Sequence, residues 1–265
     1  MTDLTPLDKV HAAMQSDPED DAARLGFFER LADSELFLML QATPTGDEAT
    51  VTPEIFETGG QSYVLVFDRE ERLAAFSGDV TPFIALSGRN IAEMLAGQQL
   101  GLGVNLGVAP SAILLPDEAV RWLHETLGNR PEVVETRVDE VSPPRGLPEN
   151  LIRALDAKLA AAMGLAASAY LVAVTYRSGA RGHMLAFLGA VPQAETALAR
   201  AVAEALTFSG IEAGVIDVGF FRLSDPIVAK LERVGLRFDL PQPQETVIQE
   251  RSAPGMDPAR PPKLK

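Results

Sequence analysis

The segment of residues 128–150, GNRPEVVETRVDEVSPPRGLPEN, places the strongest constraint on how this chain can fold. Its density of proline and glycine is typical of a boundary between structural units, and a strand is predicted inside it. A chain of 265 residues is long enough for two domains of ordinary size. The charge changes at the same place, because residues 1–130 carry 21 acidic and 8 basic side chains and residues 131–265 carry 16 and 15. We therefore predict two domains that divide near residue 130.

Residues 20–130 have the patterns of a first α+β domain. Thr58, Gly59 and Gly60 separate two strand-like runs and favour a hairpin. A separate short helix is expected within residues 1–19. The domain is expected to contain a mixed or antiparallel sheet, with strands within residues 35–42, 50–57, 61–68, 81–88 and 101–116 and helices within residues 19–34, 69–78, 89–99 and 116–128.

Residues 131–240 have a more regular pattern and predict a second domain. Strands are expected within residues 132–141, 168–179, 182–191 and 213–224, helices within residues 147–164, 192–210 and 225–235, and a last short strand within residues 236–241. The order β-α-β-β-α-β predicts a ferredoxin-like fold, with an antiparallel sheet and its helices on one face. The final residues, 241–265, contain six prolines and are expected to form a disordered tail.

Composition excludes several classes of site. The chain has no cysteine, which excludes disulfides, thiolate catalysis and iron–sulfur clusters. His11, His124 and His183 lie far apart in the sequence, so no histidine-rich metal site is expected. An all-carboxylate Mg²⁺ or Ca²⁺ site stays open as an alternative, but no D-x-[DN]-x-[DN]-G loop occurs, so no metal ligands are assigned and no cofactor is expected. The net charge of −14 argues against a nucleic-acid or anionic-membrane partner.

One uncharged run approaches the length of a membrane span. Residues 159–176, LAAAMGLAASAYLVAVTY, contain no charge, but Gly164 divides an alanine-rich half from a β-branched half. The pattern predicts the end of a helix, a turn and a buried strand, and no membrane insertion. The N-terminus lacks the pattern of a signal peptide, so the cytoplasm is the expected location.

The glycine-rich stretch of residues 101–116, GLGVNLGVAPSAILLP, raises the question of a nucleotide site. Its spacing, G-x-G-x-x-x-G, is not the dinucleotide pattern, and no lysine follows as a P-loop requires. We interpret it as a strand, a tight turn and a strand. Val104 and Leu106 are expected to point inward, and Asn105 is expected to shape the turn. Ligand contact by Asn105 is kept as the alternative.

The predicted helix start at LSGRN offers a candidate ligand site. Ser87, Gly88 and Arg89 could hold an anion at the positive end of the helix. The alternative is that Ser87 or Asn90 caps the helix.

Five further residues are singled out, and two of them, Asp217 and Asp68, have both a functional and a structural interpretation. Asp217, within an apolar strand, is a candidate ligand residue, or else faces solvent or a polar partner. Asp68 could be a site carboxylate, but a turn or cap role is favoured. Trp122 and Phe28 are expected in the core, and His183 is expected to be exposed in a hairpin turn.

The order of the first domain's motifs resembles the N-terminal domain of the SseB family of bacterial proteins. The resemblance rests on ELFLMLQA, YVLVFDREERLAAF, FIALSGRNIAEML and GLGVNLG, and covers residues 20–128. Many members have proline after the turn asparagine, whereas this chain has Leu106. The second domain resembles the family's C-terminal domain in less specific motifs. The family name denotes enhanced serine sensitivity, and the resemblance supplies no catalytic residues.

We expect a non-enzymatic, cytoplasmic protein of the SseB type that acts by binding, with another protein as its partner. The acidic first domain would suit a basic partner, or else serves only solubility. A link to serine or amino-acid tolerance follows from the resemblance. The alternatives are a small-molecule sensor of amino acids and an enzyme with an unrecognised site. A homodimer through the second domain is a further expectation.

Overall fold

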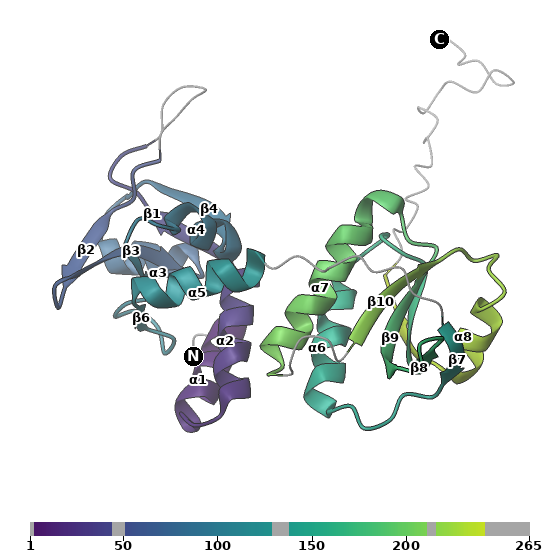
Figure 1. Cartoon of the computed structure of the whole chain (residues 1–265). Helices are drawn as coiled ribbons and strands as arrows, with labels where there is room; N and C mark the ends of the chain where they lie inside the picture. The colour runs from purple at the N-terminus through teal and green to yellow at the C-terminus, as the bar shows by residue number, and fades with distance from the viewer. Residues whose placement is uncertain (1–2, 44–50, 129–137, 211–215, 242–265) are drawn as a thin grey trace, which may run out of the picture.

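The computed structural model describes residues 3–43, 51–128, 138–210 and 216–241, and it contains two sheets that each carry their own helices. Figure 1 shows the two assemblies side by side, the first in purple to teal and the second in teal-green to yellow. We call them the N-terminal unit and the C-terminal unit. The α+β class is confirmed. The predicted division near residue 130 and the tail beyond Pro241 lie outside the described residues.

The sheet of the N-terminal unit is mixed. Its strands are β1 (Glu35–Met39), β2 (Ile55–Thr58), β3 (Gln61–Phe67), β4 (Phe83–Ser87), β5 (Gly101–Val104) and β6 (Ile113–Leu115). They lie in the order β4-β1-β3-β5-β6, and β2 pairs with β3 as the predicted hairpin. β3 and β5 run parallel, and the other pairs are antiparallel.

Four of this unit's helices cover one face of the sheet. Its helices are α1 (Pro6–Ser16), α2 (Asp21–Asp33), α3 (Glu70–Ser77), α4 (Gly88–Leu95) and α5 (Asp117–Gly128). Leu7, Phe27, Ile91 and Leu123 bring α1, α2, α4 and α5 into one buried cluster with the inner face of the sheet. The helix expected within residues 1–19 therefore packs into this unit. α3 packs on the opposite face, where Leu73 contacts another buried cluster.

The sheet of the C-terminal unit differs from the expected topology. Its elements are β7 (Val138–Ser142), α6 (Glu149–Ala160), β8 (Ser168–Tyr176), β9 (Arg181–Leu188), a short 3-10 helix (Pro192–Ala194), α7 (Glu195–Phe208), β10 (Ile216–Phe221), α8 (Val228–Val234) and β11 (Leu236–Asp239). The strand order is β10-β9-β8-β11, and β7 also pairs with β8.

The prediction of a ferredoxin-like arrangement is wrong for this sheet. A split βαβ unit inserts a strand between the two parallel strands that a helix connects. Here α7 connects β9 and β10, which are parallel and directly paired. α6 and α7 cover one face, whereas α8 packs on the other through Val228 and Leu231. The same order of helices and strands along the chain is thus compatible with more than one strand order in the sheet, and the observed strand pairing shows which one forms.

The uncharged run of residues 159–176 divides as predicted. α6 ends at Ala160, Gly164 adopts a φ of +71° in the turn, and β8 begins at Ser168. Among the described residues, no helix has both the length and the apolar character needed to cross a membrane.

Candidate functional site

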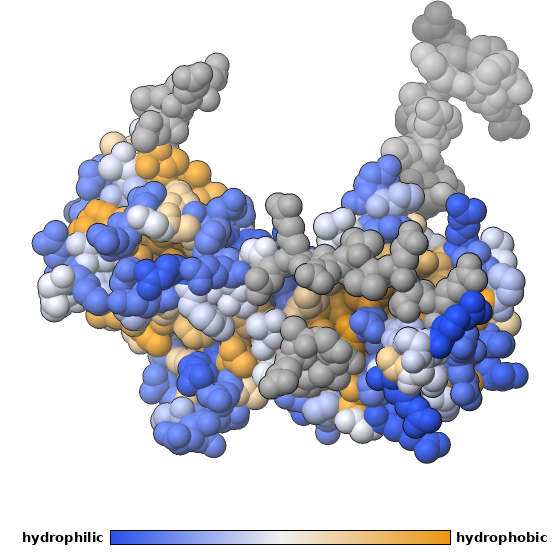
Figure 2. Space-filling model, viewed as in Figure 1, coloured by the Kyte–Doolittle hydropathy of each residue, from blue (hydrophilic) through white to orange (hydrophobic). Residues whose placement is uncertain are grey.

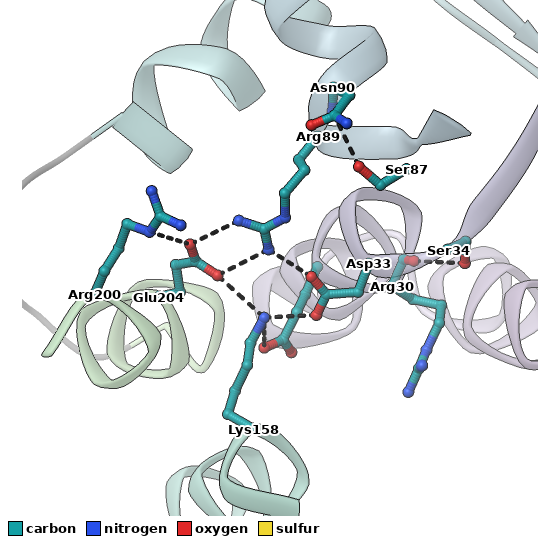
Figure 3. A network of polar contacts seen from close by, with 10 residues as sticks. Arg30, Asp33, Ser34, Ser87, Arg89, Asn90, Lys158, Arg200 and Glu204 are labelled. Carbon is teal, nitrogen blue, oxygen red and sulfur yellow. Dashed lines mark hydrogen bonds and ion pairs between the residues drawn. The ribbon is translucent and has the colours of Figure 1, made fainter. Parts of the chain in front are cut away.

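The start of α4 holds three of the predicted site residues (Figure 3). The Ser87 hydroxyl accepts a hydrogen bond from the Asn90 backbone N–H at 3.3 Å, which is the capping interaction of the alternative interpretation. The Gly88 N–H donates to the Ser34 carbonyl oxygen at 3.0 Å. A Cβ on Gly88 would lie 2.0 Å from the Leu31 carbonyl oxygen, so glycine permits α4 to approach the end of α2.

Arg89 points away from the helix start and joins the two units. Its guanidinium donates to Asp33 of α2 at 2.6 Å, and to both carboxylate oxygens of Glu204 of α7 at 3.1 and 3.2 Å. These bonds connect α4, α2 and α7, as Figure 3 shows. The guanidinium therefore faces carboxylates of the chain itself, which would compete with any anion.

Lys158 of α6 extends the same group of charges. Its ammonium lies 2.6 Å from Asp33, 3.2 Å from Glu204 and 3.4 Å from Glu29. Arg200 approaches Glu204 at 3.7 Å from the exposed side of α7. We call these six residues the ion cluster: Glu29, Asp33, Arg89, Lys158, Arg200 and Glu204. Three carboxylates and three cations balance one another in it.

The pKa shifts show which cluster members are stabilised in their charged form. Burial would raise the pKa of Glu204, but hydrogen bonds from Arg89 and the charge of Lys158 lower it below its usual value. Burial is likewise outweighed at Asp33, where Lys158 and Arg89 lower the pKa. The hydrogen bond to Glu204 is the largest influence on Arg89 and raises its pKa. These three groups stay ionised at neutral pH and hold one another in place.

Glu29 is the exception in the ion cluster. Burial raises its pKa above the usual value, and the charge of Lys158 offsets this only in part. Its Oε1 atom lies at ion-pair distance from Lys158 but in a geometry that makes no hydrogen bond. Ionising Glu29 therefore costs more free energy in the folded protein than in water.

An aromatic contact lies at the same junction. The ring centroids of Phe28 and Trp122 are 5.1 Å apart, and those of Trp122 and Phe208 are 6.4 Å apart. Phe208, at the end of α7, is 2% exposed and belongs to the buried cluster of the N-terminal unit. The prediction that Trp122 packs in the core is wrong, since it is 37% exposed and lies between the units. Phe28 is partly buried against the core.

Asn105 lies in a second polar network, inside the N-terminal unit. The residue is fully buried and adopts a φ of +49°, as the turn interpretation predicts. Its Oδ1 accepts from the Asp68 N–H at 3.1 Å, and its Nδ2 donates to Ser111 at 2.9 Å. Val104 is buried and Leu106 is partly buried, as expected. The turn asparagine thus connects two strand ends to each other.

The network continues to α1 and α3. Ser111 donates to Asp8 at 2.6 Å, and Arg72 forms ion pairs with Asp8 at 2.5 Å and Asp68 at 2.7 Å. Thr5 donates to Asp68 at 2.6 Å. Burial would raise the pKa of Asp8, but hydrogen bonds from Arg72, Ser111 and the Thr5 backbone hold it well below its usual range. Asp68 is therefore engaged within this network.

The first two glycines of the 101–116 stretch make room for neighbouring side chains. A Cβ on Gly101 would lie 2.5 Å from the Leu115 carbonyl oxygen and 2.5 Å from the Tyr63 ring. One on Gly103 would lie 2.9 Å from Leu106. The G-x-G spacing thus serves packing on β5.

Asp217 and His183 lie in the C-terminal unit, apart from the other predicted site residues. Asp217 accepts a hydrogen bond from the Tyr176 hydroxyl. Burial and then this carboxylate raise the pKa of Tyr176 above its usual value. His183 is half-buried beside a hollow of about 570 Å³ on the sheet, and its Nε2 lies 3.1 Å from the Arg145 carbonyl oxygen. The candidate ligand residues therefore lie in three separate places: Ser87, Gly88 and Arg89 at the start of α4, Asn105 in the buried network, and Asp217 in the C-terminal unit.

Sequence reasoning missed most of the residues that hold these networks. Glu204, Lys158, Asp8 and Arg72 occur on helices where charged residues usually face solvent. Apart from the local pairs with Asp68, Arg200 and Thr5, their partners lie at least 46 residues away in the chain. The spacing of residues along one element cannot reveal such contacts.

Comparison with known proteins gives one match. Residues 7–122 match the family model described as the SseB protein N-terminal domain. No curated protein and no solved structure gives a significant match.

Proposed function

Residues 7–122 match the model of the SseB protein N-terminal domain, and from this premise we propose that the protein is a non-enzymatic, cytoplasmic, two-domain binding protein of the SseB type. Its partner is another protein that presents a basic segment with an apolar side. The partner binds the sheet face of the N-terminal domain that lies opposite α1, α2, α4 and α5. We call this the outer sheet face.

The apolar surface of the outer sheet face is the observation that carries the proposal. Phe56 and Leu114 are each 38% exposed, and Phe76 of α3 is 37% exposed. Phe37 and Phe83 are partly buried beside them, with ring centroids 5.4 Å apart. Aromatic side chains provide large contact areas in protein interfaces.

The cover on this face is small. α3 has eight residues, and of these only Arg72 and Leu73 are buried. Strand pairing places Phe56 opposite Tyr63 and Leu114 opposite Gly103. Because Gly103 has no side chain, Leu106 and Leu65 pack over it. Leu114 adds an exposed apolar side chain at the edge of this packed surface.

The charges around this face support a basic partner. Glu35, Glu70, Glu71 and Asp79 are exposed, whereas Arg72 turns inward to Asp8 and Asp68. The first 130 residues carry 21 acidic and 8 basic side chains. Figure 2 shows apolar patches of the N-terminal unit, on the left, set among hydrophilic surface. Complementary charge increases the rate and specificity of association.

The polar networks support a binding role over catalysis. Arg89, Asn105 and Asp68 are each bonded to other groups of the chain. A catalytic group must instead reach a substrate within hydrogen-bond distance. The arrangement of these three residues is accounted for by their role in connecting elements of the fold.

Site-specific photo-cross-linking in cells tests the proposal. A photoreactive phenylalanine analogue replaces Phe56 or Leu114, and Val191 on the C-terminal unit is the control, since it is also exposed. We expect positions 56 and 114 to give the same discrete adduct, whose partner peptide is basic and apolar, and position 191 to lack it. Adducts that are identical at all three positions, or none at positions 56 and 114, would contradict the proposal.

A further inference from the structure

The hollow in the C-terminal unit lies where three strands continue beyond their helical cover. Side chains of alternate residues point to one face of a strand, so Ala173 and Thr175 share the face of Ala169 and Leu171. Ala169 and Leu171 are buried under α6 and α7, whereas Ala173 and Thr175 line the hollow. The two helices therefore leave the last part of this face uncovered among the described residues.

Strand pairing arranges the lining residues in two rows. Thr175 lies between Glu140 of β7 and Arg181 of β9, and Ala173 lies between Ser142 and His183. The middle strand thus contributes the small side chains of the floor, and Glu140, Arg181 and His183 of the outer strands form the walls. The hollow between them measures about 570 Å³, which is within the usual size of small-molecule sites.

Opposite charges face each other across this floor. Neighbouring strands lie about 4.8 Å apart, so the backbones of Glu140 and Arg181 are separated by roughly 10 Å. Within the described part of the chain, neither side chain has an ion-pair partner. Nearby Asp139 of β7 and Arg177, which directly follows β8, do pair, at 3.6 Å. The separated pair leaves space for a molecule that carries both charges.

We propose that this hollow binds a small zwitterion that carries an ammonium group and a carboxylate or phosphate group. Arg181 donates to the anionic group, because guanidinium matches the two oxygens of such anions. Glu140 accepts from the ammonium group. The hydroxyl of Thr175 lies between them, and the hydroxyl of Ser142 lines the same hollow in the next row, as further hydrogen-bonding groups. The contact of His183 with the Arg145 carbonyl oxygen holds one wall in place.

NMR titration of the full chain tests this site, with the His183 ring and the Thr175 amide as reporters. The probes are glycine, β-alanine, 4-aminobutyrate and phosphoethanolamine, which differ in charge separation and in the anionic group. Acetate and methylammonium are controls that carry one charge each. We expect at least one zwitterion to give saturable shifts at both reporters, and the single charges to give none that saturate.

Matched variants separate the site from general charge effects. Glu140→Gln and Arg181→Met should each weaken binding at least fivefold, because each removes one of the two charged contacts. Asp139→Asn, on β7, and Arg177→Met, directly after β8, change charges close to the hollow and should leave the affinity within twofold. No saturable shift with any probe, equal shifts with acetate, or equal losses in both pairs of variants would overturn the inference. None of these results depends on the partner of the outer sheet face.

Discussion

Glu204 of α7 accepts two hydrogen bonds from Arg89 of α4, at 3.1 and 3.2 Å, although 115 residues separate them in the chain. The position of Arg89 at a predicted helix start makes it a candidate for ligand binding. The structure directs it to the opposite unit, where Lys158 and Asp33 complete the contact. This relationship makes the ion cluster part of the junction between the two sheets.

Glu204→Gln should lower the free energy of unfolding by about 2 kcal/mol, because Arg89 and Lys158 would keep their burial and lose a charged partner. Urea unfolding at neutral pH measures the change. Arg24→Gln is the control, since Arg24 pairs with Asp21 where both side chains are more than half exposed. It should change stability by less than about 0.5 kcal/mol. Equal effects of the two variants would contradict a role for the ion cluster.

Glu29→Gln removes the same charge from the same cluster but should not destabilise the protein at pH 7. Burial raises the folded-state pKa of Glu29, so ionising this group costs more in the folded state than in the unfolded state. The contribution of Glu29 to stability therefore falls as pH rises from its unfolded-state pKa through its higher folded-state pKa. The urea unfolding midpoint of the variant, relative to that of the parent protein, should be higher at pH 7 than at pH 4. A loss at pH 7 as large as that of Glu204→Gln would refute this assignment.

Asp8→Asn should show the opposite dependence on pH. The folded-state pKa of Asp8 is lowered, so its contribution is present above the unfolded value of about 3.9 and is lost as pH falls toward the folded pKa. We expect a loss of about 3 kcal/mol at pH 7, because Arg72 would be left with one buried carboxylate in place of two.

The pH profile distinguishes this role from simple damage to α1. Between pH 4 and pH 2 the parent protein should lose stability more steeply than Asp8→Asn, measured by thermal unfolding. Asp156→Asn, at an exposed position of α6, should keep the parent slope. Parallel slopes for the parent protein and Asp8→Asn would mean that the ionised carboxylate is not the stabilising form.

Two glycine substitutions should act in opposite directions. Gly88→Ala would place a Cβ 2.0 Å from the Leu31 carbonyl oxygen, so α4 must move and the free energy of unfolding should fall by about 2 kcal/mol or more. Gly26→Ala, within α2, meets nothing within 4 Å and should raise it by about 0.5–1 kcal/mol. Chemical denaturation of both variants checks the signs. Similar changes would show that the contact between α2 and α4 is looser than the structure has it.

Local features of the fold could be predicted from the sequence because neighbouring residues determine them. The Thr58–Gly60 hairpin has two glycines at positive φ, and Ser87 caps α4. Asn105 takes the left-handed conformation that a turn asparagine tolerates. Each of these predictions rests on a preference of one residue or one turn.

Long-range features could not be predicted in the same way. The period of a strand says which residues share a face, but not which strand lies beside it, so β9 and β10 could not be assigned as neighbours. Trp122 falls on the side of α5 that meets α7, and its own helix gives no sign of that contact. The hollow on β7, β8 and β9 likewise exists only because pairing brings Glu140 and Arg181 to either side of Thr175.

The affinity of the cross-linked partner's basic segment, measured as a labelled peptide by fluorescence anisotropy, tests the central claim most directly. The double variant Phe56→Ser with Leu114→Ser removes exposed apolar contacts from the outer sheet face, and Val191→Ser with Leu223→Ser is the control on the C-terminal unit. We predict that the first weakens binding at least about tenfold, since losing 1.4 kcal/mol has this effect. The affinity of the control double variant for the peptide should stay within about twofold of that of the parent protein. Equal affinities for both double variants would contradict a binding surface on the outer sheet face.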